Sequence, residues 1–285
     1  MKQWTDNIYQ ITFPAPRPHA RAANSFLLSH ERLLIDAGFA GAANYTRLTA
    51  ALAQLNLQVT DLQVIVITHH HSDHVGLLEA LPPTIPVYAA PGLSFYGTPA
   101  YQRAIDHLKL PAAVPPAARH NVQQRLETRL VPALSKRTIR PLTALTQFGL
   151  HARTVAGHSA QDTIITDDHG HWFTGDLLLA GIVFNSLLDI DPLSQSIVPH
   201  LRAQYRQFLR QVETLFPADA TLYPGHGTPF TMEEAARIAR QNQRFMARIA
   251  TQKAALPGDT SYEDVVQATL HQLHVPAYFY VSALY

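Results

Sequence analysis

The sequence predicts an α/β fold, and three observations support this. Short apolar segments with the spacing of strands alternate with longer segments whose apolar residues recur every three or four positions. Polar loops that contain glycine follow several of the predicted strands. Hydrophobic residues make up 47% of the 285 residues, which is enough for a sizeable core. This length suits one large domain or about two smaller ones.

The first part of the chain predicts strands, a helix and a further strand. Strands are expected at 7–13, 24–28 and 32–35, and the last two are separated by a hairpin-sized connection. A helix is expected at 43–55, because a tyrosine and three leucines fall on one of its faces. The apolar segment 62–67 then predicts a buried strand of the kind found in parallel sheets.

Residues 91–141 interrupt this pattern, since they are rich in proline and contain two predicted helical pieces, near 100–108 and 117–130. We interpret them as a helical cap inserted into the fold, and a surface decoration without a role is the alternative. Phe95, Tyr96 and Tyr101 are expected either to line an apolar pocket beneath the cap or to pack on its base.

Strands and helices return after the insertion. The expected elements are strands at 148–155, 163–166, 171–174 and 220–223 and helices at 198–215, 232–255 and 260–273. The apolar tail 275–285 is expected to pack on the chain or to form a dimer contact. We therefore predict a catalytic domain over 1–230 and a C-terminal helical extension over 231–285.

Composition excludes several classes of protein. Lys and Arg total 22 and Asp and Glu 21, and the net charge of +1 does not suit a dedicated polyanion binder. The absence of cysteine excludes disulfides, a thiol nucleophile and thiolate metal ligands. Apolar stretches fall short of the about 20 residues needed to span a membrane, and we expect a cytoplasmic protein without a membrane partner.

The chemistry-bearing segment is Thr68-His-His-His-Ser-Asp-His74, directly after the predicted buried strand. It contains the pattern His69-x-His71-x-Asp73-His74. So many imidazoles and carboxylates in a short loop cannot all be satisfied as core polar groups. Imidazole and carboxylate do suit zinc, iron or manganese.

Three further candidates each follow a predicted strand and have glycine beside them: His158, Asp176 and His226. Loops at strand ends are where an α/β scaffold places its chemistry. The order and spacing of these motifs, with the acidic segment Leu33-Leu-Ile-Asp36-Ala-Gly38, resemble those of the metallo-β-lactamase superfamily over about residues 24–227. The resemblance implies an αββα sandwich, here with a helical cap insertion and C-terminal helices.

The resemblance also implies a site for two divalent metal ions, zinc being favoured and iron and manganese remaining open. The implied ligands are His69, His71 and His158 for one ion and Asp73, His74 and His226 for the other. Asp176 would bridge the two ions, and Asp36 would orient the ligand loops. An aspartate bridge without a cysteine ligand is typical of the glyoxalase II, lactonase and ribonuclease Z branches. The C-terminal helices resemble those of glyoxalase II-like and β-lactamase-like hydrolases.

The function implied is hydrolysis of a small acyl substrate (a thioester, ester or lactone) by a hydroxide that bridges the two metals. Asp73 and Asp176 are the expected catalytic carboxylates, and Asp73 is a candidate proton shuttle. A phosphodiesterase or nuclease, a redox member of the superfamily, and a metal-stabilised binding or regulatory protein stay open. The expected partner is a small molecule rather than a nucleic acid, and a homodimer stays open.

Other polar residues are expected to lie outside the site. His70 is predicted to be a bystander, and His19, His169 and His171 are predicted to lie on the surface. A basic turn at 136–140 is predicted to be solvated rather than to bind an anionic substrate.

Overall fold

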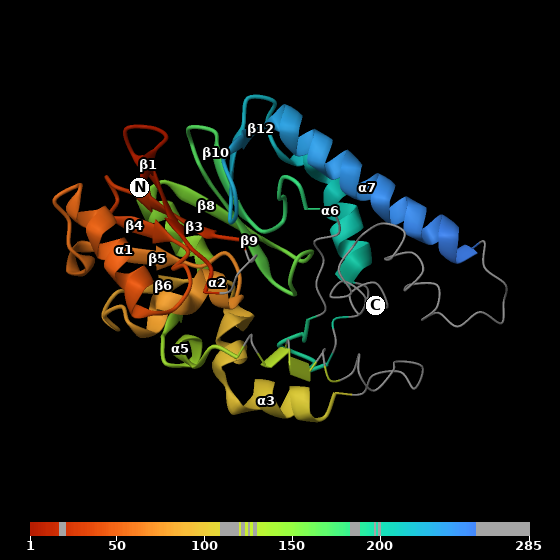
Figure 1. Cartoon of the computed structure of the whole chain (residues 1–285), viewed down its shortest axis with the longest axis horizontal. Helices are drawn as coiled ribbons and strands as arrows, with labels where there is room; N and C mark the ends of the chain where they lie inside the picture. Colours follow the sequence, from red (N-terminus) through yellow and green to blue (C-terminus); the bar gives the residue numbers. More distant parts are fainter. Residues whose placement is uncertain are drawn as a thin grey trace.

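Two β-sheets pack face to face in the computed structural model, and helices cover both outer faces (Figure 1). The structure describes residues 1–16, 21–108, 120, 123–124, 126–127, 130–182, 189–196, 198 and 201–254. This is the αββα arrangement that the sequence predicts. None of the helices in these ranges is both long and apolar enough to cross a membrane.

The first sheet has the strand order β1-β2-β3-β4-β5-β6-β7 among the described residues. Its strands are β1 Lys2–Gln3, β2 Ile8–Phe13, β3 Ala23–Leu28, β4 Leu33–Ile35, β5 Val64–Val66, β6 Val87–Tyr88 and β7 Ile139–Arg140. The pairs from β1 to β4 are antiparallel and those from β4 to β7 are parallel. Strand β5 is buried throughout, as the apolar segment 62–67 predicts.

The second sheet has the order β12-β11-β10-β9-β8. Its strands are β8 Leu150–Val155, β9 Asp162–Asp167, β10 His171–Gly175, β11 Thr221–Pro224 and β12 Phe230–Thr231. Strands β9 and β10 form the predicted antiparallel hairpin, and β10 pairs with β11 in parallel. The polypeptide therefore leaves β10 and β11 at the same edge of the sheet.

The helices fall into an N-terminal, an inserted and a C-terminal group. They are α1 Ala42–Ala53, α2 Ser72–Val75, α3 Pro99–Asp106, α5 Pro132–Ser135, α6 Leu201–Leu215 and α7 Met232–Ala254, with 3₁₀ turns η1 Val59–Asp61, η2 Gly76–Glu79, η3 Pro91–Gly97 and η4 Leu142–Phe148. In Figure 1, α1 covers the first sheet, whereas α6 and α7 lie side by side on the second. The predicted helix 260–273 and the tail 275–285 lie outside the described residues.

Three apolar cores follow from these layers. One joins the first sheet to α1 and the insertion, one joins the second sheet to α6 and α7, and one fills the space between the sheets. In the central core, Phe26 of the first sheet contacts Phe173 and Tyr223 of the second, with ring centroids 5.4 Å apart in both pairs. These contacts hold the two sheets face to face, so loops from both sheets can meet at one edge.

Aromatic residues of the insertion pack against one another. The ring centroids of Phe95, Tyr96 and Tyr101 lie 5.1–5.5 Å apart, and all three side chains are buried. Of the two expectations for these residues, this contact supports packing at the base of the cap. Most of the predicted helical piece 117–130 lies outside the described residues.

Candidate metal centre

The loop that follows β5 is fixed by Asp36, at the end of β4. Asp36 has a φ of 61°, a left-handed conformation that aspartate tolerates better than most residues. Its carboxylate accepts hydrogen bonds from Thr68 N at 2.8 Å and from Thr68 Oγ1 at 2.8 and 3.1 Å. It also lies 2.8 Å from Nδ1 of His74. One buried carboxylate therefore orients both ends of the loop.

These contacts determine which ring nitrogens face the centre. Because Thr68 Oγ1 donates its proton to Asp36, it accepts a hydrogen bond from Nδ1 of His69, at 3.1 Å. Nδ1 of His74 likewise donates to Asp36. Nε2 of His69 and Nε2 of His74 are therefore the ring nitrogens that face inward, as metal-ligating histidines require.

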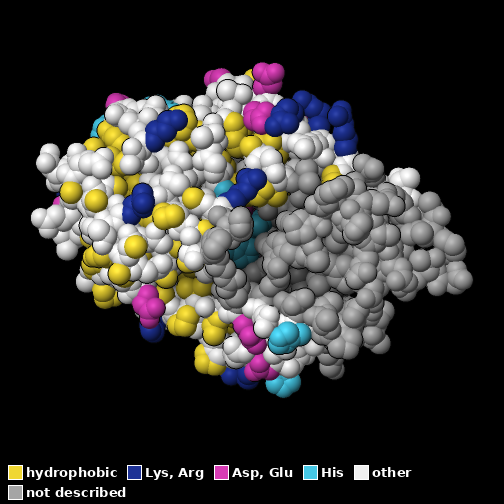
Figure 2. Space-filling model, in the orientation of Figure 1, with side chains coloured by type: hydrophobic (Ala, Val, Ile, Leu, Met, Phe, Trp, Pro, Cys, Tyr) yellow, Lys and Arg dark blue, Asp and Glu magenta, His cyan; other side chains and the backbone are white. Residues whose placement is uncertain are grey.

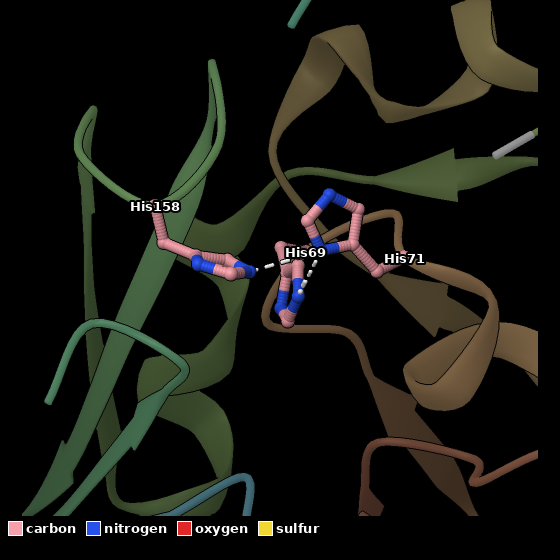
Figure 3. Close-up of side chains that lie close together, drawn as sticks. All are labelled: His69, His71 and His158. Carbon is pink, nitrogen blue, oxygen red and sulfur yellow. Dashed lines mark hydrogen bonds between the residues drawn. The ribbon is translucent and has the colours of Figure 1, made fainter. Parts of the chain in front are cut away.

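The first candidate ligand group consists of His69, His71 and His158 (Figure 3). Nδ1 of His71 lies 3.0 Å from Nε2 of His69 and 2.9 Å from Nε2 of His158. Two nitrogen ligands on one tetrahedral zinc ion lie about 3.3 Å apart, given zinc–nitrogen distances of about 2.0–2.1 Å. All three side chains are buried, so the group fits an ion shielded from bulk water.

The second candidate group consists of Asp73, His74 and His226. Oδ2 of Asp73 lies 3.2 Å from Nε2 of His226 and 3.8 Å from Nε2 of His74. His74 Nε2 is buried and has no hydrogen-bond partner among the described residues. An inward-facing imidazole nitrogen of this kind is a donor atom that a cation would satisfy.

Asp176 lies between the two groups. Its carboxylate oxygens approach His226 Nε2 at 3.2 Å, His74 Nε2 at 3.5 Å and His158 Nε2 at 3.6 Å. The structure therefore brings together all seven residues that the resemblance implies as ligands, with the Asp176 carboxylate near histidines of both groups. Histidine side chains are visible at the bottom of a hollow in the face shown in Figure 2.

Two glycines make this close approach possible. A Cβ atom on Gly225 would clash with Oδ1 of Asp176 and with the ring of His74. Gly175 has a φ of 51°, and a Cβ there would press on Thr68. The glycines next to Asp176 and His226 are thus required by space as well as by backbone conformation.

The His158 loop is held by Asp162, which the sequence analysis did not single out. The Asp162 carboxylate accepts hydrogen bonds from the backbone nitrogens of His158 and Ser159 and from the Ser159 hydroxyl, at 2.7–3.2 Å. Burial raises the pKa of Asp162 to about 8 in spite of these donors. The spacing of four residues between ligand and aspartate was the available signal, but such spacing is common in loops.

The histidines of the two groups have pKa values shifted in opposite directions. Burial and then the neighbouring histidines lower the pKa of His69 well below its usual value. Burial also opposes a charge on His226, but Asp176 and Asp73 outweigh it and raise the pKa of His226 to about 10. Burial also opposes a charge on His74, but the neighbouring aspartates outweigh it and raise the pKa of His74 well above its usual value. The field that holds protons on His74 and His226 is the field that would attract a divalent cation.

His70 faces the insertion rather than the candidate ligands. Its ring stacks on Tyr96 with centroids 3.4 Å apart, and its Nε2 lies 3.6 Å from Asp189 Oδ1. Asp189 also accepts hydrogen bonds from the Tyr96 hydroxyl and from the backbone nitrogen of Ala160. His70 is a member of neither ligand group described above, and its role as a bystander stays a prediction.

Two predictions about polar surface residues are wrong in part. Arg137 is not a solvated member of a basic turn, because it donates to four backbone carbonyls between residues 78 and 85. His171 is half-buried and lies 2.6 Å from Asp167, whereas His169 is exposed as predicted. His19 lies outside the described residues.

Comparison with known proteins agrees with this geometry. Residues 20–226 match the metallo-beta-lactamase superfamily. A probable metallo-hydrolase of Bacillus subtilis, YqjP, is 24% identical over 254 residues, which cover 84% of this chain and 78% of that protein. A shorter stretch of 56 residues is 45% identical to the exodeoxyribonuclease WalJ of Streptococcus pneumoniae and covers 19% of each protein.

Solved structures show the same fold. The metallo-beta-lactamase family protein TTHA1429 of Thermus thermophilus superposes with a TM-score of 0.70 and 20% identity, covering 98% of this chain and 91% of that one. A beta-lactamase domain protein of Burkholderia ambifaria gives a TM-score of 0.69 and 21% identity, covering 99% and 85%. TTHA1623, solved in a di-iron-bound form, is 25% identical, with a TM-score of 0.51 and coverage of 81% and 98%.

The fold, the clustered histidines and aspartates and these relatives define a metal-dependent hydrolase. The chain belongs to the metallo-beta-lactamase superfamily, and the resemblance stated from its motifs is confirmed.

Proposed function

We propose that the protein is a dinuclear hydrolase of a small acyl compound, namely a thioester, an ester or a lactone. The observation that carries this proposal is the position of Asp176, whose carboxylate touches both the histidine group and the Asp73 group. Divalent ions held there would polarise an acyl oxygen and lower the pKa of a coordinated water. The ligands would be His69, His71, Asp73, His74, His158, Asp176 and His226.

The chain's own carboxylates have different roles in this proposal. Asp176 is buried, and its pKa is held well below its usual value because His226 and His74 outweigh the effect of burial. It therefore stays ionised and serves as the bridge. Asp73 is more open, with 22% of its side chain exposed, and lies at hydrogen-bond distance from His226. Asp73 is the group placed to pass a proton towards a departing alcohol or thiol.

An acyl substrate is favoured over a polyanion by charge. The net charge is +1, and Arg137 of the basic turn is committed to backbone carbonyls. The second candidate function is a phosphodiesterase or nuclease, which the local similarity to WalJ favours. A metal-stabilised binding protein with little turnover is the third.

Zinc is our proposed metal, since nitrogen and carboxylate ligands suit it. Iron is the alternative, supported by the di-iron form of TTHA1623. A glyoxalase II-like substrate range and a cytoplasmic location complete the proposal. A homodimer stays open; cell fractionation would test the location and solution mass the oligomeric state.

Initial rates on metal-reconstituted protein test the proposal. Acyl thioesters and lactones are compared with a bis-aryl phosphodiester, and Asp176→Ala is the blank. We expect acyl turnover well above the blank and a folded but inactive variant. Turnover of the phosphodiester alone would instead support the nuclease function. Full activity in Asp176→Ala would overturn the bridging assignment.

A further inference from the structure

Asn24, the second residue of β3, lies against the loop that carries His226. Its side chain is buried, with 1% exposed. The amide nitrogen Nδ2 donates to the carbonyl of Pro224 at 3.1 Å and to the carbonyl of Gly227 at 2.9 Å. These carbonyls stand on either side of His226, so one side chain holds the loop at both of its ends.

The backbone next to Asn24 holds the same loop. Asn24 N donates to the carbonyl of Gly225 at 2.8 Å. The carbonyl of Ala22 lies 2.7 Å from Nδ1 of His226. A carbonyl can only accept, so Nδ1 carries a proton, and Nε2 is the ring nitrogen that faces Asp73 and Asp176.

The orientation of the Asn24 amide is itself fixed. Gln10 Nε2 donates to Asn24 Oδ1 at 2.7 Å and to the carbonyl of Gly227 at 3.0 Å. Thr12 Oγ1 also donates to Asn24 Oδ1, at 3.1 Å. Trp4 Nε1 in turn donates to Gln10 Oε1 at 2.9 Å. A buried polar network in which every partner is satisfied is rigid and specifies one arrangement.

The His226 loop needs such support because it has little of its own. Gly225 packs against Asp176 and His74 without room for a side chain, and Gly227 turns with a φ of 85°. The first ligand group is supported elsewhere: Thr68 holds His69, and Asp162 holds the backbone of His158. The Asn24 network therefore bears on one of the two groups only.

We propose that Asn24 is a positioning residue for His226, and that it raises the cation affinity of the Asp73–His74–His226 group without affecting the His69–His71–His158 group. This rests on the proposed function, which assigns one ion to each group. Asn24 positions His226 through the hydrogen bonds of its Nδ2 to the two carbonyls, and Gln10 keeps Nδ2 facing these carbonyls.

Cobalt(II) titration of the full-length protein, followed by absorption, tests this proposal. Asn24→Asp keeps the shape of the side chain but replaces Nδ2 by an oxygen that faces two carbonyl oxygens. We expect one of the two binding steps to weaken by about 10–100-fold and the other to stay unchanged. Thr12→Val is the matched control, because it removes a bond to Oδ1 and leaves both Nδ2 bonds; it should bind like wild type.

A second variant and a second signal keep the test decisive. Gln10→Leu frees the Asn24 amide and should weaken the same step, even if Asn24→Asp does not fold. Equal weakening of both steps, or no weakening in either variant, would overturn the proposal. If wild-type protein binds a single equivalent of cobalt, the proposed two-metal function is wrong.

In that case the NMR signal of the His226 Nδ1 proton in metal-free protein tests the positioning role of Asn24. Loss of the signal in Asn24→Asp or Gln10→Leu, but not in Thr12→Val, supports this role. Persistence of the signal in both Asn24→Asp and Gln10→Leu overturns it.

Discussion

The ring orientation of single histidines is set by neighbours outside the ligand set. Asp36 acts directly on His74 and, through Thr68, on His69, whereas the carbonyl of Ala22 acts on His226. In each case Nδ1 is occupied and Nε2 faces the centre. The ligand motif alone does not reveal this, because the partners lie about 30 to 200 positions away along the chain.

Asp36→Asn tests this arrangement at its most connected residue. An amide cannot accept hydrogen bonds at both of its terminal atoms, so Thr68 or His74 loses a partner. We expect metal affinity to fall by about 10–100-fold with the fold retained, measured by competition with a chelator. Asp6→Asn, on an exposed loop, is the control. Equal affinity in the two variants would show that Asp36 does not orient the ligands.

The pKa of His226, raised to about 10, gives a pH-dependent prediction. Below about pH 10 the metal-free His226 holds a proton that an ion must displace, so affinity at this group falls as the pH falls. The drop should be about tenfold per pH unit for each proton released. His69, with its lowered pKa, is already neutral near pH 7, so the first group should respond less. Metal titrations at pH 6.5, 7.5 and 8.5 measure how the affinity of each group changes with pH. The same pH dependence at both groups would contradict the opposite pKa shifts of His226 and His69.

At the scale of elements, the ligand loops depend on strand ends that the sequence predicts well. The buried segment 62–67, the hairpin of β9 and β10 and the helix α7 are all found, because their apolar patterns extend over enough residues to be distinctive. Strands β1, β7 and β12 were not predicted, since each has only two residues and therefore shows no periodicity. The packing of the cap aromatics likewise depends on contacts that no local pattern encodes.

Gly225→Ala tests the close approach of the loops after β10 and β11. Its added Cβ would meet Asp176 and His74, so we expect metal binding to be lost or strongly weakened. Gly149→Ala is the contrast, because its φ of 69° strains the backbone while no atom lies within 4 Å of the added Cβ. Melting curves and metal content of both variants measure the effect. We expect both variants to be less stable than the wild type, but only Gly225→Ala to bind metal less well.

At the scale of the whole molecule, the candidate centre joins the two sheets. His69, His71, Asp73 and His74 follow the first sheet, whereas His158, Asp176 and His226 come from loops of the second. The motif predicted these seven residues, but not the supports Asn24 and Asp162, since a single asparagine or aspartate in a strand forms no motif of its own. Ions shared by both sheets would stabilise the sandwich as well as catalyse.

Removal of metal should therefore lower the melting temperature. An ion at about 100 times its Kd contributes about 2.7 kcal/mol, which corresponds to about 5–10 °C for a domain of this size. Calorimetry with and without a chelator measures the shift, and Asp176→Ala should show a smaller one. A melting temperature that does not respond to the chelator would mean that the ions do not join the sheets.

The number of metal ions bound per chain tests most directly whether Asp176 bridges a two-metal centre. The wild-type protein would be loaded with zinc, freed of unbound metal by gel filtration and analysed by elemental mass spectrometry. We expect two equivalents of zinc per chain in the wild type and fewer in Asp176→Ala. A single equivalent in the wild type, or the same content in the variant, would contradict a two-metal centre bridged by Asp176.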